Sequence, residues 1–147
     1  MFQGMNNSLN PERRLVRVLL ADDMPQVLRD LHRLLDLTGV MTVVGEALNG
    51  EDAVQLAAEL HPDAVIMDLE MPGVDGYEAA HRIKNETPGV RVIILSVHAG
   101  PEERRRARAA GADCFVVKGE SYEVLVDAIR GTAGLSDGLN RNKGRQT

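Results

Sequence analysis

Short apolar runs alternate with longer amphipathic segments along most of this chain of 147 residues. The runs are rich in branched side chains, as is typical of strands that are buried on both faces of a sheet. The pattern predicts five strands, at residues 15–20, 41–44, 64–67, 90–95 and 114–117.

The segments between these runs predict helices. After the first run, Leu28, Leu31 and Leu35 recur with helical spacing, Pro25 suits a first helical turn and Gly39 is a stop signal. The same reasoning predicts helices near residues 50–60, 75–85, 101–111 and 121–130, the last with Ser121 as its cap. Five strand–helix units with short connections imply a parallel sheet covered by helices on both faces. We therefore expect one compact three-layer α/β domain over residues 15–131.

Both ends of the chain differ in composition from this domain. Residues 1–14 are polar and contain Phe2-Gln3-Gly4-Met5, which resembles the remnant of a protease-cleavage tag and would make Met5 the natural start. We expect residues 1–14 to be a tag remnant or a disordered N-terminus. Residues 132–147 are dominated by Gly, Ser, Asp, Asn, Lys and Arg, which predicts a flexible tail or linker stub.

Composition narrows the function classes. The net charge of -5 and the absence of Trp argue against a nucleic-acid binder, which needs cationic contacts and stacking platforms. The single cysteine, Cys114, provides neither an internal disulfide nor a zinc cluster, so a small core residue in a reducing compartment is expected. No stretch has the length of a membrane span and the start lacks a secretory signal, which favours a cytoplasmic protein.

Polar residues follow four of the five apolar runs. Asp22 and Asp23 follow the first, Asp68 the third, Ser96 the fourth and Lys118 the fifth. Taken singly, an Asp at a strand end is also explained as a helix cap or a turn residue. In a parallel sheet, however, all of these positions lie at the edge where ligands bind in open α/β folds.

Three carboxylates that meet at one edge repel each other, so they need a divalent cation or raised pKa values. Magnesium, or manganese in its place, suits hard oxygen ligands and shares its shell with phosphate oxygens. A carboxylate can then act as a nucleophile and form an acyl phosphate. Lys118 would supply positive charge and Ser96 a hydroxyl donor to the transferred group.

The motifs at these strand ends resemble those of a known family. Leu20-Ala21-Asp22-Asp23, Met67 to Gly76, Ser96, Gly111-Ala112 and Val117-Lys118-Gly119 occur in the order and spacing of the receiver domain of bacterial two-component response regulators. The resemblance covers about four fifths of the chain. It implies a flavodoxin-like (βα)5 three-layer sandwich with a parallel sheet of strand order 2-1-3-4-5.

The resemblance also implies roles for the acidic residues. Asp68 would accept a phosphoryl group from a phosphohistidine on a histidine kinase or phosphotransfer protein, or from a small acyl phosphate. Asp23, Asp68 and the backbone carbonyl of Glu70 would hold Mg²⁺ directly, and Asp22 would act largely through a bound water.

Five further side chains take roles from the same resemblance. Ser96 and Lys118 would each bond a phosphate oxygen, and Ser96 would act as a switch together with Phe115, which is at the family's aromatic switch position. Phe115 has no hydroxyl, so permanent burial in the core is the competing interpretation. Glu70 and His98 would tune hydrolysis of the acyl phosphate, or would simply be exposed side chains.

Four arginines, Arg104, Arg105, Arg106 and Arg108, make the fourth helix strongly cationic. Such a run is either a solvated face or a docking surface, and the resemblance places the output interface on the fourth helix, fifth strand and fifth helix. An unknown acidic output protein would fit this helix, and a homodimer is a further partner to consider. We expect this chain to contact neither a membrane nor, directly, a nucleic acid.

The leading interpretation is a phosphorylation-activated switch, not a turnover enzyme. Aspartate-nucleophile phosphatases use the same residue types, but they carry an Asp-x-Asp pair on the first strand. A flavin-binding module would need a Ser/Thr/Gly-rich loop that is absent here. Residues 43–47 and 128–130 are similar to LuxR-type receivers that precede a DNA-binding domain, so the chain is either a stand-alone receiver or a fragment of a transcription regulator.

Overall fold

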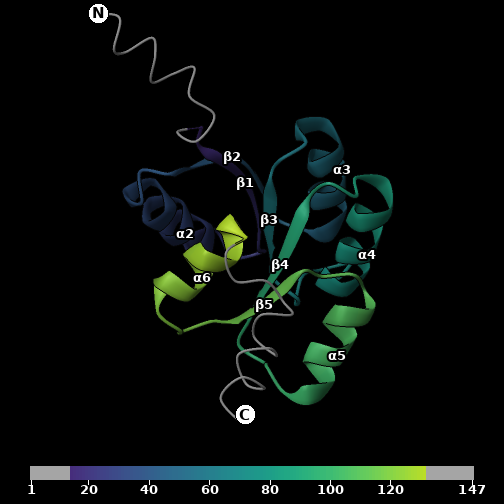
Figure 1. Cartoon of the computed structure of the whole chain (residues 1–147). Helices are drawn as coiled ribbons and strands as arrows, with labels where there is room; N and C mark the ends of the chain where they lie inside the picture. The colour runs from purple at the N-terminus through teal and green to yellow at the C-terminus, as the bar shows by residue number, and fades with distance from the viewer. Residues whose placement is uncertain (1–13, 132–147) are drawn as a thin grey trace, which may run out of the picture.

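The computed structural model describes residues 14–131, and the segments expected to be a tag remnant or tail lie outside these residues, apart from Arg14. Strands and helices alternate throughout (Figure 1). They are β1 (Val16–Ala21), α2 (Pro25–Leu37), β2 (Met41–Ala47), α3 (Gly50–Leu60), β3 (Ala64–Met67), α4 (Gly76–Glu86), β4 (Arg91–Ser96), α5 (Pro101–Ala109), β5 (Cys114–Val117) and α6 (Tyr122–Arg130). Among these residues, no helix has the length and apolar character needed to cross a membrane.

The five strands form one parallel sheet in the order β2-β1-β3-β4-β5, which confirms the flavodoxin-like topology. Helices α2 and α6 cover one face, and α3, α4 and α5 cover the other (Figure 1). Each face has its own cluster of buried apolar side chains. Cys114 is 7% exposed and packs in the cluster under α2 and α6, as expected for a small core residue.

Local signals in the sequence explain most of the helix starts. The side chains of Asn49 and Asp75 each accept a hydrogen bond from the backbone N–H three residues further on, which caps α3 and α4. Ser121 occupies the cap position of α6, but its side chain makes no capping hydrogen bond. The expected position was therefore right, and the expected bond is absent.

Strand β2 is longer than the pattern predicted, because it ends at Ala47 and not at Val44. It stays paired with β1 up to Ala21, across a register shift in the middle of the pair. A glycine such as Gly45 usually weakens a strand. Here it leaves room for the side chain of Leu60, whose Cδ1 would lie 2.9 Å from a Cβ on residue 45. Packing of α3 on the strand thus outweighs the local preference of glycine.

Two glycines make close contacts with the backbone of the loop between β3 and α4. A Cβ on Gly50, the first residue of α3, would collide with the backbone carbonyl of Val74. A Cβ on Gly76, the first residue of α4, would collide with the backbone carbonyl of Asp68. The backbone that follows Asp68 is therefore held closely against the starts of both helices.

Candidate functional site

Three aspartates meet where β1 and β3 end. The backbone N–H of Asp22 donates to the carbonyl of Ala47, and that of Asp68 donates to the carbonyl of Ala21, so strand pairing continues up to both residues. One carboxylate oxygen from each of Asp22, Asp23 and Asp68 lies within 4.8 Å of the others. Asp22 and Asp68 are buried and Asp23 is exposed, so the cluster opens to solvent on one side.

Lys118 lies opposite this cluster. Its Nζ is 3.2 Å from Oδ2 of Asp22 and 3.3 Å from Oδ1 of Asp68. Its backbone N–H donates to the carbonyl of Ser96 at 2.8 Å, which fixes the lysine just beyond the paired ends of β4 and β5. The structure thus brings the predicted lysine and all three predicted carboxylates together.

Asp22 and Asp23 do not serve as the side-chain cap of α2. The cap residue is Met24, whose side chain makes no capping bond. Asp22 instead uses Oδ1 to accept the backbone N–H of Met24 at 2.9 Å, while its Oδ2 faces Lys118. Both carboxylate oxygens of this buried residue are therefore oriented by the protein.

The electrostatics of the cluster are unbalanced. Burial raises the pKa of Asp68 above its usual value, the negative charge of Asp22 raises it further, and Lys118 only partly opposes these effects. Burial lowers the pKa of Lys118, but the charges of Asp68 and Asp22 outweigh burial, so the net pKa lies above its usual value. One ammonium faces three carboxylates, so the donor set fits a hard divalent cation.

This imbalance predicts that Asp68→Asn stabilises the metal-free protein. The pKa of Asp68 is higher in the folded state than in the unfolded chain, so the folded state binds more protons and stability falls as pH rises through the interval between the two values. At neutral pH the ionised carboxylate is destabilising. We expect the variant to gain roughly 1 kcal/mol, or about 4 °C in Tm, measured by thermal unfolding in a chelator.

The pH dependence provides the control for this prediction. The difference in Tm between Asp68→Asn and the wild type should shrink at acidic pH, where Asp68 is protonated in both states. Magnesium should raise the Tm of the wild type more than that of the variant. A variant that is less stable than the wild type at neutral pH in chelator would contradict the electrostatic account.

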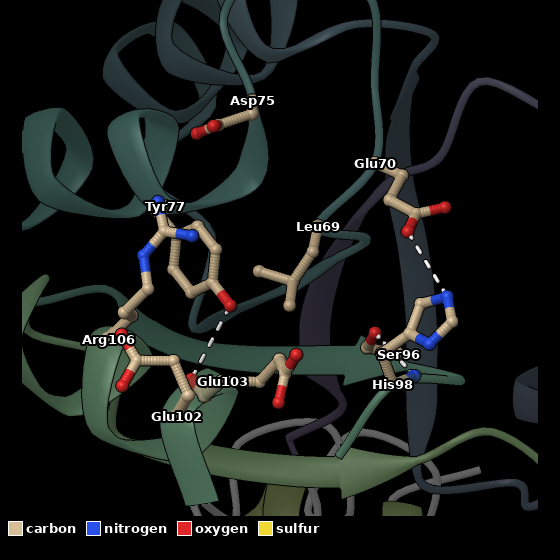
Figure 2. A pocket seen from close by; sticks show the side chains of 9 residues that line it. All are labelled: Leu69, Glu70, Asp75, Tyr77, Ser96, His98, Glu102, Glu103 and Arg106. Atoms are coloured by element: carbon tan, nitrogen blue, oxygen red, sulfur yellow. Dashed lines mark hydrogen bonds and ion pairs between the residues drawn. The ribbon is translucent and has the colours of Figure 1, made fainter. Parts of the chain in front are cut away.

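Ser96 lies at the edge of a cavity of about 300 Å³ between the β4–α5 loop and the start of α4 (Figure 2). The serine is 2% exposed, and its Oγ accepts the backbone N–H of His98 at 3.1 Å. Nε2 of His98 is 3.4 Å from Oε2 of Glu70, and both side chains are largely exposed. The two positions implied in hydrolysis tuning thus lie face to face at the rim of the cavity (Figure 2).

Phe115 is buried, with 7% of its surface exposed. The guanidinium of Arg104 lies 4.9 Å from the centre of its ring. Nε of Arg104 also donates to the backbone carbonyl of Ala99 at 3.2 Å. The ring therefore lies in the core, with a cation held over it.

The arginines of α5 differ in what they contact. Besides Arg104, Arg106 contacts an aromatic ring, with its guanidinium 4.1 Å from the centre of Tyr77 (Figure 2). Arg105 pairs with Glu102 on the outer surface. These contacts with aromatic rings were not predicted from the sequence, although Arg104 lies three residues before the buried Ala107 and so shares its helix face.

A parallel sheet of order 2-1-3-4-5 with clustered carboxylates and an opposed lysine at its carboxyl edge defines a flavodoxin-like α/β domain with an acidic site that could hold a metal ion. Comparison with family models is more specific, because residues 18–130 match the response regulator receiver domain. The chain belongs to this family. Its members are mainly phosphoacceptors of two-component systems, and they bind Mg²⁺ at an acidic pocket.

Individual relatives are similar over the same region. The response regulator GacA of Pseudomonas aeruginosa is 38% identical over 117 residues, which are 79% of this chain and 54% of the relative. The nitrate/nitrite response regulator NarL of Escherichia coli is 34% identical over 116 residues, which are 79% of this chain and 54% of the relative. The chain thus spans a little over half the length of these curated relatives.

Solved structures agree with the fold. The response regulator domain of Thermotoga maritima CheB matches with a TM-score of 0.75 and 33% identity, over 80% of this chain and 96% of that one. A LuxR-family DNA-binding response regulator from Staphylococcus aureus matches with a TM-score of 0.74 and 31% identity, over 80% of this chain and 98% of that one.

Proposed function

We propose that this chain is a signalling switch that is activated when Asp68 accepts a phosphoryl group. The observation that carries the proposal is the position of Lys118, whose Nζ lies within 3.3 Å of both Asp22 and Asp68. A lysine there can pair with a phosphoryl oxygen on Asp68 while it stays close to Asp22. The donors proposed are a phosphohistidine on a histidine kinase or phosphotransfer protein, and a small acyl phosphate.

The transfer needs little from the protein beyond position and charge. A carboxylate oxygen of Asp68 attacks phosphorus, so an O–P bond forms while the N–P bond of the phosphohistidine breaks. The imidazole nitrogen keeps the electron pair of the broken bond and takes up a proton. Lys118 and the hydroxyl of Ser96 donate hydrogen bonds to two of the phosphoryl oxygens, where negative charge is concentrated.

We propose that Asp23, Asp68 and the backbone carbonyl of Glu70 hold Mg²⁺, or Mn²⁺ in its place, and that Asp22 contributes through a water. The clustering of the three carboxylates supports this assignment. When bound, the metal neutralises the carboxylates and polarises a phosphoryl oxygen. The close contacts of Gly76 with the backbone of Asp68 and Leu69 hold the chain that leads to Glu70 firmly in place, which supports a backbone ligand there.

The chain would not be a turnover enzyme in this proposal. Its chemistry would be limited to its own phosphorylation and to hydrolysis of its own acyl phosphate, in which water attacks phosphorus and the Asp68 carboxylate leaves. The phosphatase alternative requires an Asp-x-Asp pair on β1, whereas Asp22 and Asp23 are adjacent and the isolated Asp68 follows β3.

Incubation with acetyl phosphate and magnesium tests the proposal directly. Intact-protein mass spectrometry should find one added phosphoryl group, and mild base should remove it because acyl phosphates are labile in base. A protein whose mass stays unchanged, or an adduct that survives base, would contradict phosphorylation of an aspartate.

The contact between Glu70 and His98 leads to a prediction about the lifetime of the phosphoryl group. The two side chains face each other at the cavity rim, and we propose that they obstruct the approach of water to a phosphoryl group on Asp68. Replacing both with alanine should speed hydrolysis about fivefold, equivalent to about 1 kcal/mol, measured as loss of the acyl phosphate with time. His81→Ala, at an exposed site on α4, is the matched control, and equal lifetimes in all three proteins would exclude this role.

Two further proposals concern output. The similarity to the LuxR-family DNA-binding response regulator from Staphylococcus aureus supports the proposal that the chain is the receiver of a DNA-binding regulator, and a stand-alone receiver is the alternative. Contact with an acidic output protein would use Arg105 and Arg108, the exposed arginines of α5 that contact neither Tyr77 nor Phe115. We also propose that the protein forms a homodimer and that it acts in the cytoplasm. Size-exclusion chromatography with and without beryllofluoride tests the dimer.

A further inference from the structure

Helix α5 makes unusually little apolar contact with the rest of the domain. Its only fully buried side chain within Pro101–Ala109 is that of Ala107. The helix is instead attached by two arginines, because Arg104 covers the ring of Phe115 on β5 and Arg106 covers the ring of Tyr77 on α4. Such cation–π contacts depend on the geometry of two side chains, so a small displacement changes them.

Arg104 also contacts the loop between β4 and α5, which begins directly after Ser96. Its Nε donates to the carbonyl of Ala99, three residues after Ser96. The intervening turn is tied to the serine, because Oγ of Ser96 accepts the N–H of His98. One chain of contacts therefore runs from Ser96 through His98 and Ala99 to Arg104, and from Arg104 to Phe115.

The cavity beside Ser96 gives this loop room to move. Its lining includes Ser96 and His98 on one side, and Tyr77 and Arg106 on the other (Figure 2). A shift of the β4–α5 loop across this space would not compress the close-packed core, whose side chains resist displacement. Phe115 is already buried, so the ring need not be the part that travels.

We propose that Arg104 is the positioning residue that couples Ser96 to α5. The inference rests on the proposed phosphorylation of Asp68. When Ser96 moves to bond a phosphoryl oxygen, Ala99 moves with it, and the hydrogen bond to Arg104 transmits the displacement to the helix. The ring of Phe115 supports the guanidinium of Arg104 through this movement.

Hydrogen exchange on α5 with and without beryllofluoride and magnesium tests this coupling. Beryllofluoride stands in for the phosphoryl group on Asp68. In the wild type, the probe should protect the ends of β1 and β3 and should change the exchange of α5. In Arg104→Met, which keeps an unbranched side chain over Phe115 but lacks the charge and the Nε donor, the protection at β1 and β3 should persist while the change in α5 is lost.

Arg105→Met is the matched control, because Arg105 is on the same helix but pairs with Glu102 at the surface. It should respond as the wild type does. Arg104→Lys keeps the charge without the planar group and should also lose the α5 response. If circular dichroism shows that Arg104→Met does not fold, Arg104→Lys replaces it in the comparison.

The outcomes separate this inference from the proposed function. A wild type that shows no protection at β1 and β3 would count against phosphorylation of Asp68 itself. Protection at those ends without any change in α5 would contradict the coupling. An α5 response in folded Arg104→Met that equals the wild-type response would also contradict the coupling. Failure of that variant to bind beryllofluoride would contradict it as well, because Arg104 would then belong to the binding site.

Discussion

Asp68→Asn is expected to abolish phosphorylation by acetyl phosphate, because the amide that replaces the carboxylate is not a nucleophile for phosphorus. The substitution keeps the shape of the side chain. It also relieves charge repulsion with Asp22, so loss of phosphorylation should occur in a protein that is at least as stable as the wild type. Intact mass spectrometry of the two proteins after the same incubation measures the effect.

Asp30→Asn serves as the matched control for that substitution. Asp30 is an exposed aspartate on α2 that bonds only Gln26 among the described residues, so its replacement should leave the mass gain unchanged. An adduct of equal size and base lability on Asp68→Asn would mean that another residue is the acceptor. In that case the cluster of Asp22, Asp23 and Lys118 would need a different interpretation.

Removal of divalent metal should slow phosphorylation of the wild type by at least about a hundredfold, since polarisation of a phosphoryl oxygen by a bound metal is worth several kcal/mol. In chelator, Asp68 also faces the charge of Asp22 with only Lys118 in opposition. The measurement is the rate of mass gain with acetyl phosphate as magnesium is titrated back.

Asp23→Asn makes the same prediction specific to the site. Asp23 is the exposed member of the cluster, so its replacement should disturb the fold little while it removes one proposed ligand. We expect the variant to need at least about tenfold more magnesium for half-maximal rate, because a charged ligand oxygen is replaced by a neutral one. A magnesium requirement equal to that of the wild type would remove Asp23 from the ligand set.

The fold could be predicted largely because its signals are local. Branched apolar runs, helical spacing of leucines and Pro25 at a helix start each act within a few residues. The end of β2 could not be placed, because the pairing of Ala47 with Ala21 and the fit of Leu60 against Gly45 involve residues far apart in the sequence. Local patterns do not contain that information.

In the candidate site, too, the positions that follow from the strand order could be predicted, and the contacts that depend on helix packing could not. Asp22, Asp68 and Lys118 could be placed together because parallel strands end at one edge of the sheet, so the topology alone brings their side chains close. The contacts of Arg104 with Phe115 and of Arg106 with Tyr77 were missed. They depend on how α5 is rotated and seated against its neighbours, and a run of arginines resembles a solvated face until that seating is known.

The two glycines that hold the loop after Asp68 divide the site into a part that can be varied and a part that cannot. At Gly50 and Gly76 even a methyl group would push on a backbone carbonyl, so substitutions there would alter folding and chemistry together. The side chains of Glu70 and His98 are 71% and 63% exposed, so we expect both positions to accept other side chains. Variants meant to lengthen or shorten the lifetime of the proposed acyl phosphate should therefore change this exposed pair and keep Gly50 and Gly76.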